Sequence, residues 1–367
     1  MKRKALRSLH RLLLVPFLGA GLLAWGQDTD SWPDPGLSST RDLFPLNLTP
    51  LTYRPTGAST LGRGAVLVSL QITRGNTIEF SDPIKNILAA NAGQGRITFD
   101  RAAVERFAQD HAQEPLLYYF DMEVQRTEIQ FKVGLTASTD LGVTFAWQGM
   151  GGGFLDTLIE NAHDLGFQQT GRTGLARNQF TLFIIQKGQV IFFSDDPIRV
   201  HPEDPVVTAV QRLYENPWLT LSAFGRLQLP MTQWYGYQSA WDSSAGLAMQ
   251  WRPGRRLVLD GGAAYLRRAL KPYGPDPFFI RDQVAGHVAF EWLGGRRARP
   301  YLALVATSGI TAPGPETKLD RLTLTHDLGV HLRLDANKAL TFSYINNISH
   351  NENTADMELA VKLTVRR

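Results

Sequence analysis

Three ionisable side chains in one short stretch of the sequence could act together. Asp156, Glu160 and His163 are spaced i, i+4 and i+7, which places them on one face of a helix over residues 154–165. A Glu-x-x-His pair on one helical turn can offer two ligands to a metal ion or act as an acid/base group. One such pair lacks the other ligands of a complete site. The sequence therefore predicts no cofactor and leaves Glu160 and His163 as incomplete metal candidates.

Two other interpretations of this charged helix face are open. The simpler one is a solvated face held by ion pairs, with Arg126 or Arg172 as partners. The other is that the helix narrows a channel, so that its charges set which ions or solutes pass. Both interpretations depend on where the surrounding elements position this helix.

The glycines before this helix predict a hinge. Gly151, Gly152 and Gly153 follow a strand-like stretch directly, and residues without a side chain let the backbone turn sharply. A hinged amphipathic helix between two strands can fold into the mouth of a β-barrel or cover its end.

A second group of charges begins a long strand upstream. Asp121 and Glu123 are followed by Arg126, so charges of opposite sign lie on or near a polar strand face. We interpret these three residues as paired side chains that line a lumen.

The sequence carries no established catalytic motif. It lacks the Gly-x-Ser-x-Gly, His-Glu-x-x-His and phosphate-loop patterns. Ser349 beside His350 could form a hydrolase dyad, but neighbours on a strand point to opposite faces and the pair lies in an expected loop. No catalytic residue is predicted.

The first 26 residues are typical of a secretory signal peptide, with five basic residues followed by an apolar stretch from Leu12 to Leu23. Ala24 and Gly26 predict cleavage before Gln27. The full chain has 38 basic and 34 acidic residues, so loss of the five basic ones leaves a nearly neutral mature chain. A nucleic-acid partner is not supported. The absence of cysteine excludes disulfides and thiolate metal sites.

The elements that must position these residues are β-strands. Apolar residues alternate with polar or small ones over long stretches, which is the period of a strand with two different faces. These stretches are 66–72, 129–136, 284–292, 322–334 and 357–366. They are longer than most strands of soluble sandwiches, and their polar face suits a wet lumen.

The spacing of the strands indicates the architecture. From residue 215 onward, short turns alternate with long polar loops, as in an up-and-down transmembrane barrel. The short turns fall at 215–217, 252–255, 294–299 and 335–338. We predict an all-β antiparallel barrel of 12–16 strands, an even number and preferably 14, with the turns in the periplasm and the loops outside.

The predicted organisation is a signal peptide over 1–26, an extended leader over 27–44 and an outer-membrane barrel over 45–367. A short helix is expected near 100–112 in an early loop, with Asp100 as its N-cap.

One run of residues also resembles a known family. It consists of Asp-x-Glu-x-x-Arg from Asp121, then Gly-Gly-Gly-Phe-Leu-Asp-x-x-Ile-Glu-x-x-His from Gly151, and later Gly171-Arg172. The run resembles an uncharacterised bacterial family of outer-membrane β-barrel proteins. The resemblance covers most of the mature chain and implies the same fold, but the family has no assigned function.

We therefore expect a passive or gated pore for small solutes in the bacterial outer membrane. Asp156, Glu160, His163, Arg126 and Arg172 would shape its constriction. The alternatives are a membrane enzyme acting on lipid or saccharide, and a closed structural or adhesive barrel. The expected partners are outer-membrane lipid and an unidentified small solute. The oligomeric state is left open, because lipid-facing and partner-facing strands look alike in a sequence.

Overall fold

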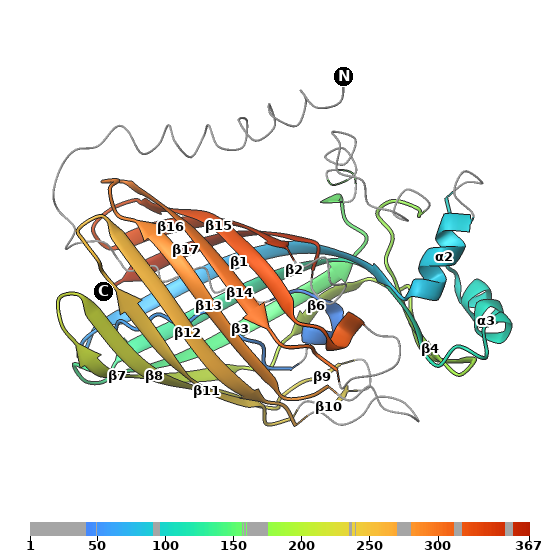
Figure 1. Ribbon diagram of the computed structural model, residues 1–367, viewed down its shortest axis with the longest axis horizontal. Helices are drawn as coiled ribbons and strands as arrows, with labels where there is room; N and C mark the ends of the chain where they lie inside the picture. The colour runs from blue at the N-terminus through green and yellow to red at the C-terminus, as the bar shows by residue number, and fades with distance from the viewer. Residues whose placement is uncertain are drawn as a thin grey trace, which may run out of the picture.

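The computed structural model describes most of the chain after residue 41. The described residues are 42–48, 50–90, 96–155, 157, 159, 175–234, 237–238, 240–269, 280–311, 318–348 and 355–367. Among them the architecture is a closed antiparallel β-barrel with an extension at one end (Figure 1). None of the described helices is long and apolar enough to cross a membrane.

Twelve of the described strands form the barrel wall. They are β1 (Val66–Phe80), β2 (Leu117–Gly134), β3 (Thr139–Gly151), β7 (Val206–Glu215), β8 (Leu219–Gln228), β11 (Ser243–Trp251), β12 (Leu257–Arg267), β13 (Gln283–Trp292), β14 (Ala298–Thr307), β15 (Thr323–Arg333), β16 (Lys338–Asn347) and β17 (Met357–Arg366). Each wall strand pairs with the next wall strand along the chain, and β1 pairs with β17 from Leu67 opposite Arg366 to Asn76 opposite Met357. This last pairing closes the wall, so every wall strand has partners on both sides.

The predicted class, an antiparallel up-and-down barrel, is confirmed, but the preferred number of 14 wall strands is wrong. The remaining strands of the large sheet are β4 (Thr181–Gln186), β5 (Gln189–Ser194) and β6 (Ile198–Pro202). The hairpin of β4 and β5 adds to β2 only at Leu117–Asp121, and β6 adds to β3 only beyond the part that β7 covers. They lengthen the wall at one end instead of crossing it.

The two ends of the barrel differ in their connections. One end, called the turn end, carries the C-terminus and five short connections: 135–138, 216–218, 252–256, 293–297 and 334–337. The opposite end, called the loop end, carries the longer connections. A two-stranded hairpin of β9 (Gln233–Trp234) and β10 (Tyr237–Gln238) lies in one of them, and the 3-10 helix η3 (Lys318–Asp320) in another. The predicted rhythm of short turns and long loops is confirmed.

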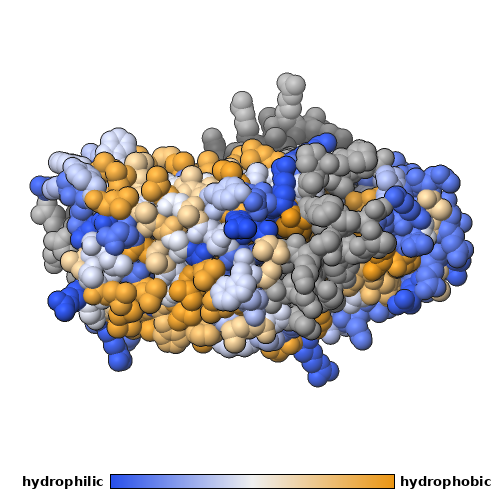
Figure 2. All heavy atoms as spheres, turned by 90° about the horizontal axis from the view of Figure 1, so that it is seen from below, coloured by the Kyte–Doolittle hydropathy of each residue, from blue (hydrophilic) through white to orange (hydrophobic). Residues whose placement is uncertain are grey.

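The two faces of the wall are also as predicted. Apolar side chains such as Leu70, Phe131, Val288 and Phe342 are exposed on the outside, whereas their polar neighbours in the strands face inward. Figure 2 shows apolar side chains gathered over the barrel wall, with hydrophilic ones at both ends of the long axis.

An extension at the loop end has its own apolar core. Helices α2 (Asp82–Ala90) and α3 (Arg101–Asp110) lie beside the prolonged ends of β1 and β2 and the hairpin of β4 and β5 (Figure 1). Ile84 and Val104 from the helices pack with Tyr119 and Phe183 from the strands. The Asp100 side chain accepts a hydrogen bond of 2.7 Å from the Ala103 backbone N–H, which confirms the predicted N-cap and helix.

Candidate functional site

The lumen of the barrel contains a segment of the chain that is not part of the wall. Residues 42–61, here called the lumen segment, precede β1 and include the 3-10 helix η1 (Pro45–Asn47). At the loop end, the Asp42 carboxylate accepts a hydrogen bond from the Ala355 backbone N–H, just before β17. At the turn end, the Leu61 N–H donates to the Asp140 carboxylate at 3.0 and 3.1 Å. The segment therefore runs through the barrel from one end to the other.

Carboxylates in the wall strands, or directly beside them, hold the backbone of the lumen segment. The Leu43 N–H donates to Glu358 at 2.8 Å, and the Leu51 N–H donates to Asp242 at 2.9 Å. An extended segment outside a sheet leaves its N–H groups without ladder partners, and a buried N–H needs one. Inward-facing carboxylates supply these partners.

Apolar contacts hold the segment against one side of the lumen. Tyr53 and Ala58 pack against Phe224, Ala248 and Ala264 of the wall, where small side chains leave room for the segment. The Tyr53 hydroxyl also lies 2.6 Å from Nδ1 of His287. Eight-stranded barrels are filled by their own side chains and barrels of sixteen or more strands leave an open channel. Twelve strands enclose an intermediate space, which the segment occupies.

Buried charges cross the lumen at the middle of the segment. Arg126 of β2 forms two hydrogen bonds to Glu203, at 2.6 and 3.0 Å, and a third to Glu128 at 2.5 Å. Glu128 also accepts a hydrogen bond from Arg54 of the lumen segment at 2.5 Å. Arg226 of β8 donates to the Arg54 carbonyl at 2.8 Å. Arg54, Arg126, Glu128 and Glu203 are here called the charge network; it joins the segment to two parts of the wall.

The charge network is stable only as a whole. The side chains of Arg126, Glu128 and Glu203 are exposed by 2–4%, and charges so deeply buried must be paired because their desolvation is costly. A bidentate arginine–carboxylate pair satisfies two donors of a guanidinium at once. We infer that the network fixes the position of the segment in the lumen.

The predicted site residues do not come together in one place. Arg126 faces the lumen, as described above. Glu123 and Asp121 have the opposite strand parity and face away from it; Asp121 accepts a hydrogen bond from the Tyr119 hydroxyl at 3.0 Å. Asp156, Glu160, His163 and Arg172 lie outside the described residues, as do most of the predicted helix over 154–165 and the Ser349–His350 pair. Within the described part of the chain, no three histidine or acidic side chains are placed to share a metal ion.

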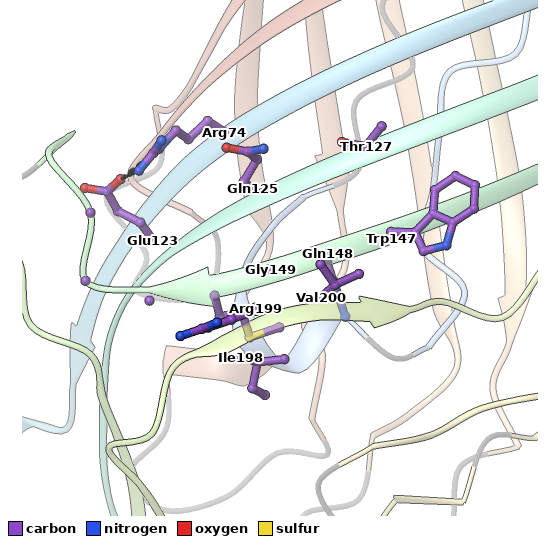
Figure 3. A pocket seen from close by; sticks show the side chains of 14 residues that line it. Arg74, Glu123, Gln125, Thr127, Trp147, Gln148, Gly149, Ile198, Arg199 and Val200 are labelled. Carbon is purple, nitrogen blue, oxygen red and sulfur yellow. Dashed lines mark hydrogen bonds and ion pairs between the residues drawn. The ribbon is translucent and has the colours of Figure 1, made fainter.

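The predicted glycine hinge is closely packed. Glu123 forms an ion pair with Arg74 at 2.9 Å (Figure 3) and accepts a hydrogen bond from the Leu155 backbone N–H. A Cβ atom at Gly153 would lie 1.7 Å from the Glu123 carboxylate, and one at Gly152 would lie 1.8 Å from the Asn178 carbonyl oxygen. Glycine is therefore required at these two positions because the chain passes close to other groups, whereas a Cβ at Gly151 would meet only Pro197 at 3.5 Å.

This close packing predicts a large effect of one added methyl group. Gly152→Ala is expected to lower the free energy of unfolding by about 1–3 kcal/mol, because the Asn178 backbone must move. Urea unfolding monitored by tryptophan fluorescence measures this change. Gly254→Ala is the matched control, since a Cβ there meets nothing within 4 Å, and it should alter the free energy by less than about 0.5 kcal/mol. Equal stability of the two variants would contradict the assigned packing.

The sequence pattern did not single out several lumen residues. Arg54 and Tyr53 lie in a stretch without periodicity, and Glu203 lies at a break between β6 and β7. Glu128 has the same parity as Arg126 in the long strand β2, and this parity was the signal that could have identified it as a partner.

A closed antiparallel wall with an apolar outer face and a polar inner face is the fold of outer-membrane β-barrels. The protein has the fold of this class. A family model described as "Protein of unknown function (DUF3187)" matches residues 87–366, and the chain belongs to this family. The predicted resemblance to an uncharacterised barrel family is thereby confirmed. No curated protein matches the sequence.

Solved structures share the fold at low sequence identity. The COG4313 outer membrane channel from Pseudomonas putida F1 is 11% identical, with a TM-score of 0.51 over 86% of this chain and 100% of that one. The NanC porin is 6% identical, with a TM-score of 0.41 over 80% of this chain and 98% of that one. At these identities the likeness concerns the fold alone.

Proposed function

We propose that this protein is a gated outer-membrane pore for small polar solutes, in which the lumen segment is the movable part. The observation that carries the proposal is that the wall is complete without the segment. β1 pairs with β17 and β2 on its two sides, so displacement of residues 42–61 breaks no pairing between wall strands. It would leave a closed ring with a lumen.

The side chains on the inner face of the wall support the proposal that the solute is polar. Thr73, Gln71, Lys362 and Thr364 line it near the β1–β17 seam and are buried, and none of them belongs to the charge network. Polar inward side chains beside an apolar outer face are typical of barrels that pass water-soluble compounds. The same outer face supports a location in the outer membrane.

A closed structural barrel is the second candidate, and one observation favours it. Leu43, Phe44 and Leu48 of the lumen segment pack with Tyr118 and Phe120 of β2 at the loop end. This apolar contact covers the mouth, and its release would expose apolar side chains to water at a free-energy cost of about 25 cal/mol per Å². A barrel in which the contact never opens would carry no solute.

A reversible cross-link distinguishes the two candidates. The Ser222 hydroxyl donates a hydrogen bond to the Ala58 carbonyl oxygen, so the lumen segment lies directly against β8 here, and a disulfide between these two positions would tie the segment to the wall. The protein has no cysteine of its own, so Ala58→Cys combined with Ser222→Cys can form only this bond. In planar bilayers we expect the oxidised double variant to lose conductance and a reductant to restore it.

Each single cysteine variant is the control for its own side chain, and both should conduct like the wild type. Equal conductance of the oxidised and reduced double variant would show that solutes pass without movement of the segment near Ala58. No conductance in any folded form would favour the closed barrel.

A further inference from the structure

A pocket opens on the outer face of the wall near the loop end. It has a volume of about 300 Å³ and is lined by β1, β2, β3 and β6. Strand pairing places Arg74 opposite Gln125 and Gln125 opposite Gly149. Figure 3 shows Arg74 and Gln125 on one side of Gly149, and Arg199 on the other. This place is here called the outer-wall pocket.

Two glycines of β3, which have no side chains, form the floor of the pocket. Gly149 and Gly151 have the parity of Trp147, whose side chain is exposed on the outside. A bulge lies beside them, because the pairing of β3 with β6 shifts between Gln148 and Met150. Bulges change the direction of neighbouring side chains. Arg199 lies opposite this bulge and borders the pocket.

The polar groups around the pocket carry a net positive charge. The Arg74 guanidinium is neutralised by Glu123 at 2.9 Å. The side chain of Arg199 is exposed and makes no hydrogen bond or ion pair with any described residue. Gln125 is likewise exposed and borders the same space. A guanidinium offers up to five donors and matches phosphate oxygens in geometry.

An apolar surface continues from the pocket toward the turn end. The next rows on the outer face are Ile72, Thr127 and Trp147, followed by Leu70, Ile129 and Phe145. Ile72, Leu70 and Phe145 are 40–47% exposed. Successive rows are about 6.6 Å apart along a strand. One ligand with a polar head and acyl chains could therefore lie on both surfaces.

We propose that the outer-wall pocket binds the phosphate-bearing headgroup of a membrane lipid, whose acyl chains lie on the apolar rows below it. Arg199 donates to the phosphate, and Gln125 donates to a neighbouring oxygen of the headgroup. The inference rests on the proposed membrane location. The pocket lies at the edge of the apolar surface, which is the depth at which lipid headgroups are found.

Lipid retention tests this proposal. The mature protein is folded into phosphatidylcholine vesicles that contain either a diphosphoryl lipid A or the same glycolipid without its phosphates. It is then extracted in mild detergent, and bound lipid is counted by native mass spectrometry. We expect wild type to retain the phosphorylated lipid and Arg199→Ala to bind it about tenfold more weakly, the loss of one charge-assisted contact. Arg255→Ala, at an exposed arginine of the turn end, is the matched control and should bind like wild type.

A second variant tests the shape of the pocket with the charges unchanged. A Cβ at Gly151 would meet only Pro197, at an ordinary 3.5 Å, so Gly151→Leu should fold while its side chain fills the floor and reduces retention. Equal retention by Arg199→Ala and wild type, or equal binding of the unphosphorylated lipid, would overturn the proposal. A protein that does not enter the vesicles at all would instead contradict the membrane location.

Discussion

Replacement of Arg126 by methionine is expected to lower the free energy of unfolding by about 3–5 kcal/mol, because it takes a buried cation away from the buried carboxylates of Glu203 and Glu128. Glu203 accepts two hydrogen bonds from Arg126. Glu128 keeps its hydrogen bond from Arg54. Methionine fills much of the volume of the arginine stem, so the effect measures the lost charge more than a cavity. Urea unfolding of the barrel in lipid vesicles, monitored by tryptophan fluorescence, gives the free energy.

An exposed ion pair is the matched control for this prediction. Arg101 and Glu105 lie one turn apart on α3, 3.1 Å from each other, with side chains more than half exposed. Arg101→Met should cost no more than about 0.5 kcal/mol, since water and salt screen such pairs. Similar losses in the two variants would mean that the buried network does not hold the lumen segment.

Removal of residues 42–61 is expected to convert a barrel that conducts only while the lumen segment is displaced into one with stable, large conductance steps. The wall strands keep all of their pairing, whereas the side chains and backbone that fill the lumen are gone. Inward carboxylates such as Asp140, Asp242 and Glu358 lose their contacts with the segment but gain water in the open lumen. Single-channel recording in planar bilayers measures the change.

A synthetic peptide of residues 42–61, added from the loop side, is the control for this deletion and should block the current again. Folding of the shortened protein is checked by its heat-modifiable migration on a gel. A folded variant that conducts no better than wild type would show that wall side chains alone fill the lumen.

The wall of the barrel could be predicted because it follows from a local pattern. The alternation of Val68, Leu70 and Ile72 with the polar Ser69 and Gln71 fixes which face is the outer one, and a shift by one residue would invert both faces. The short turns add the order of the strands. These signals need no knowledge of distant residues.

The number of wall strands was harder to predict, because local signals do not say what a strand pairs with. β4 and β5 form a tight hairpin, with Lys187 at φ 47° and Gly188 at φ 75°, which is the backbone that a two-residue hairpin turn needs. Such a hairpin looks the same inside a wall and beyond it. Only its pairing with Leu117–Asp121 places it in the extension.

The lumen segment could not be predicted from the sequence, because its partners are remote. The Leu43 N–H and the Glu358 carboxylate that accepts its hydrogen bond are 315 residues apart, and the segment has neither helical nor strand periodicity. Arg126 was identified among the lumen residues from its charge and its position in a long strand. Its ion-pair partner Glu203 was not, because a break between β6 and β7 interrupts the alternating pattern there.

The path of the lumen segment also sets a condition on how the barrel assembles. Asp42 lies at the loop end and Leu61 at the turn end, and the strand that follows is the one that seals the ring against β17. If the barrel wall closed before the segment was in place, one end of the segment would have to be threaded through the entire lumen. We expect the strands to assemble around the segment first, and the pairing of β1 with β17 to form last.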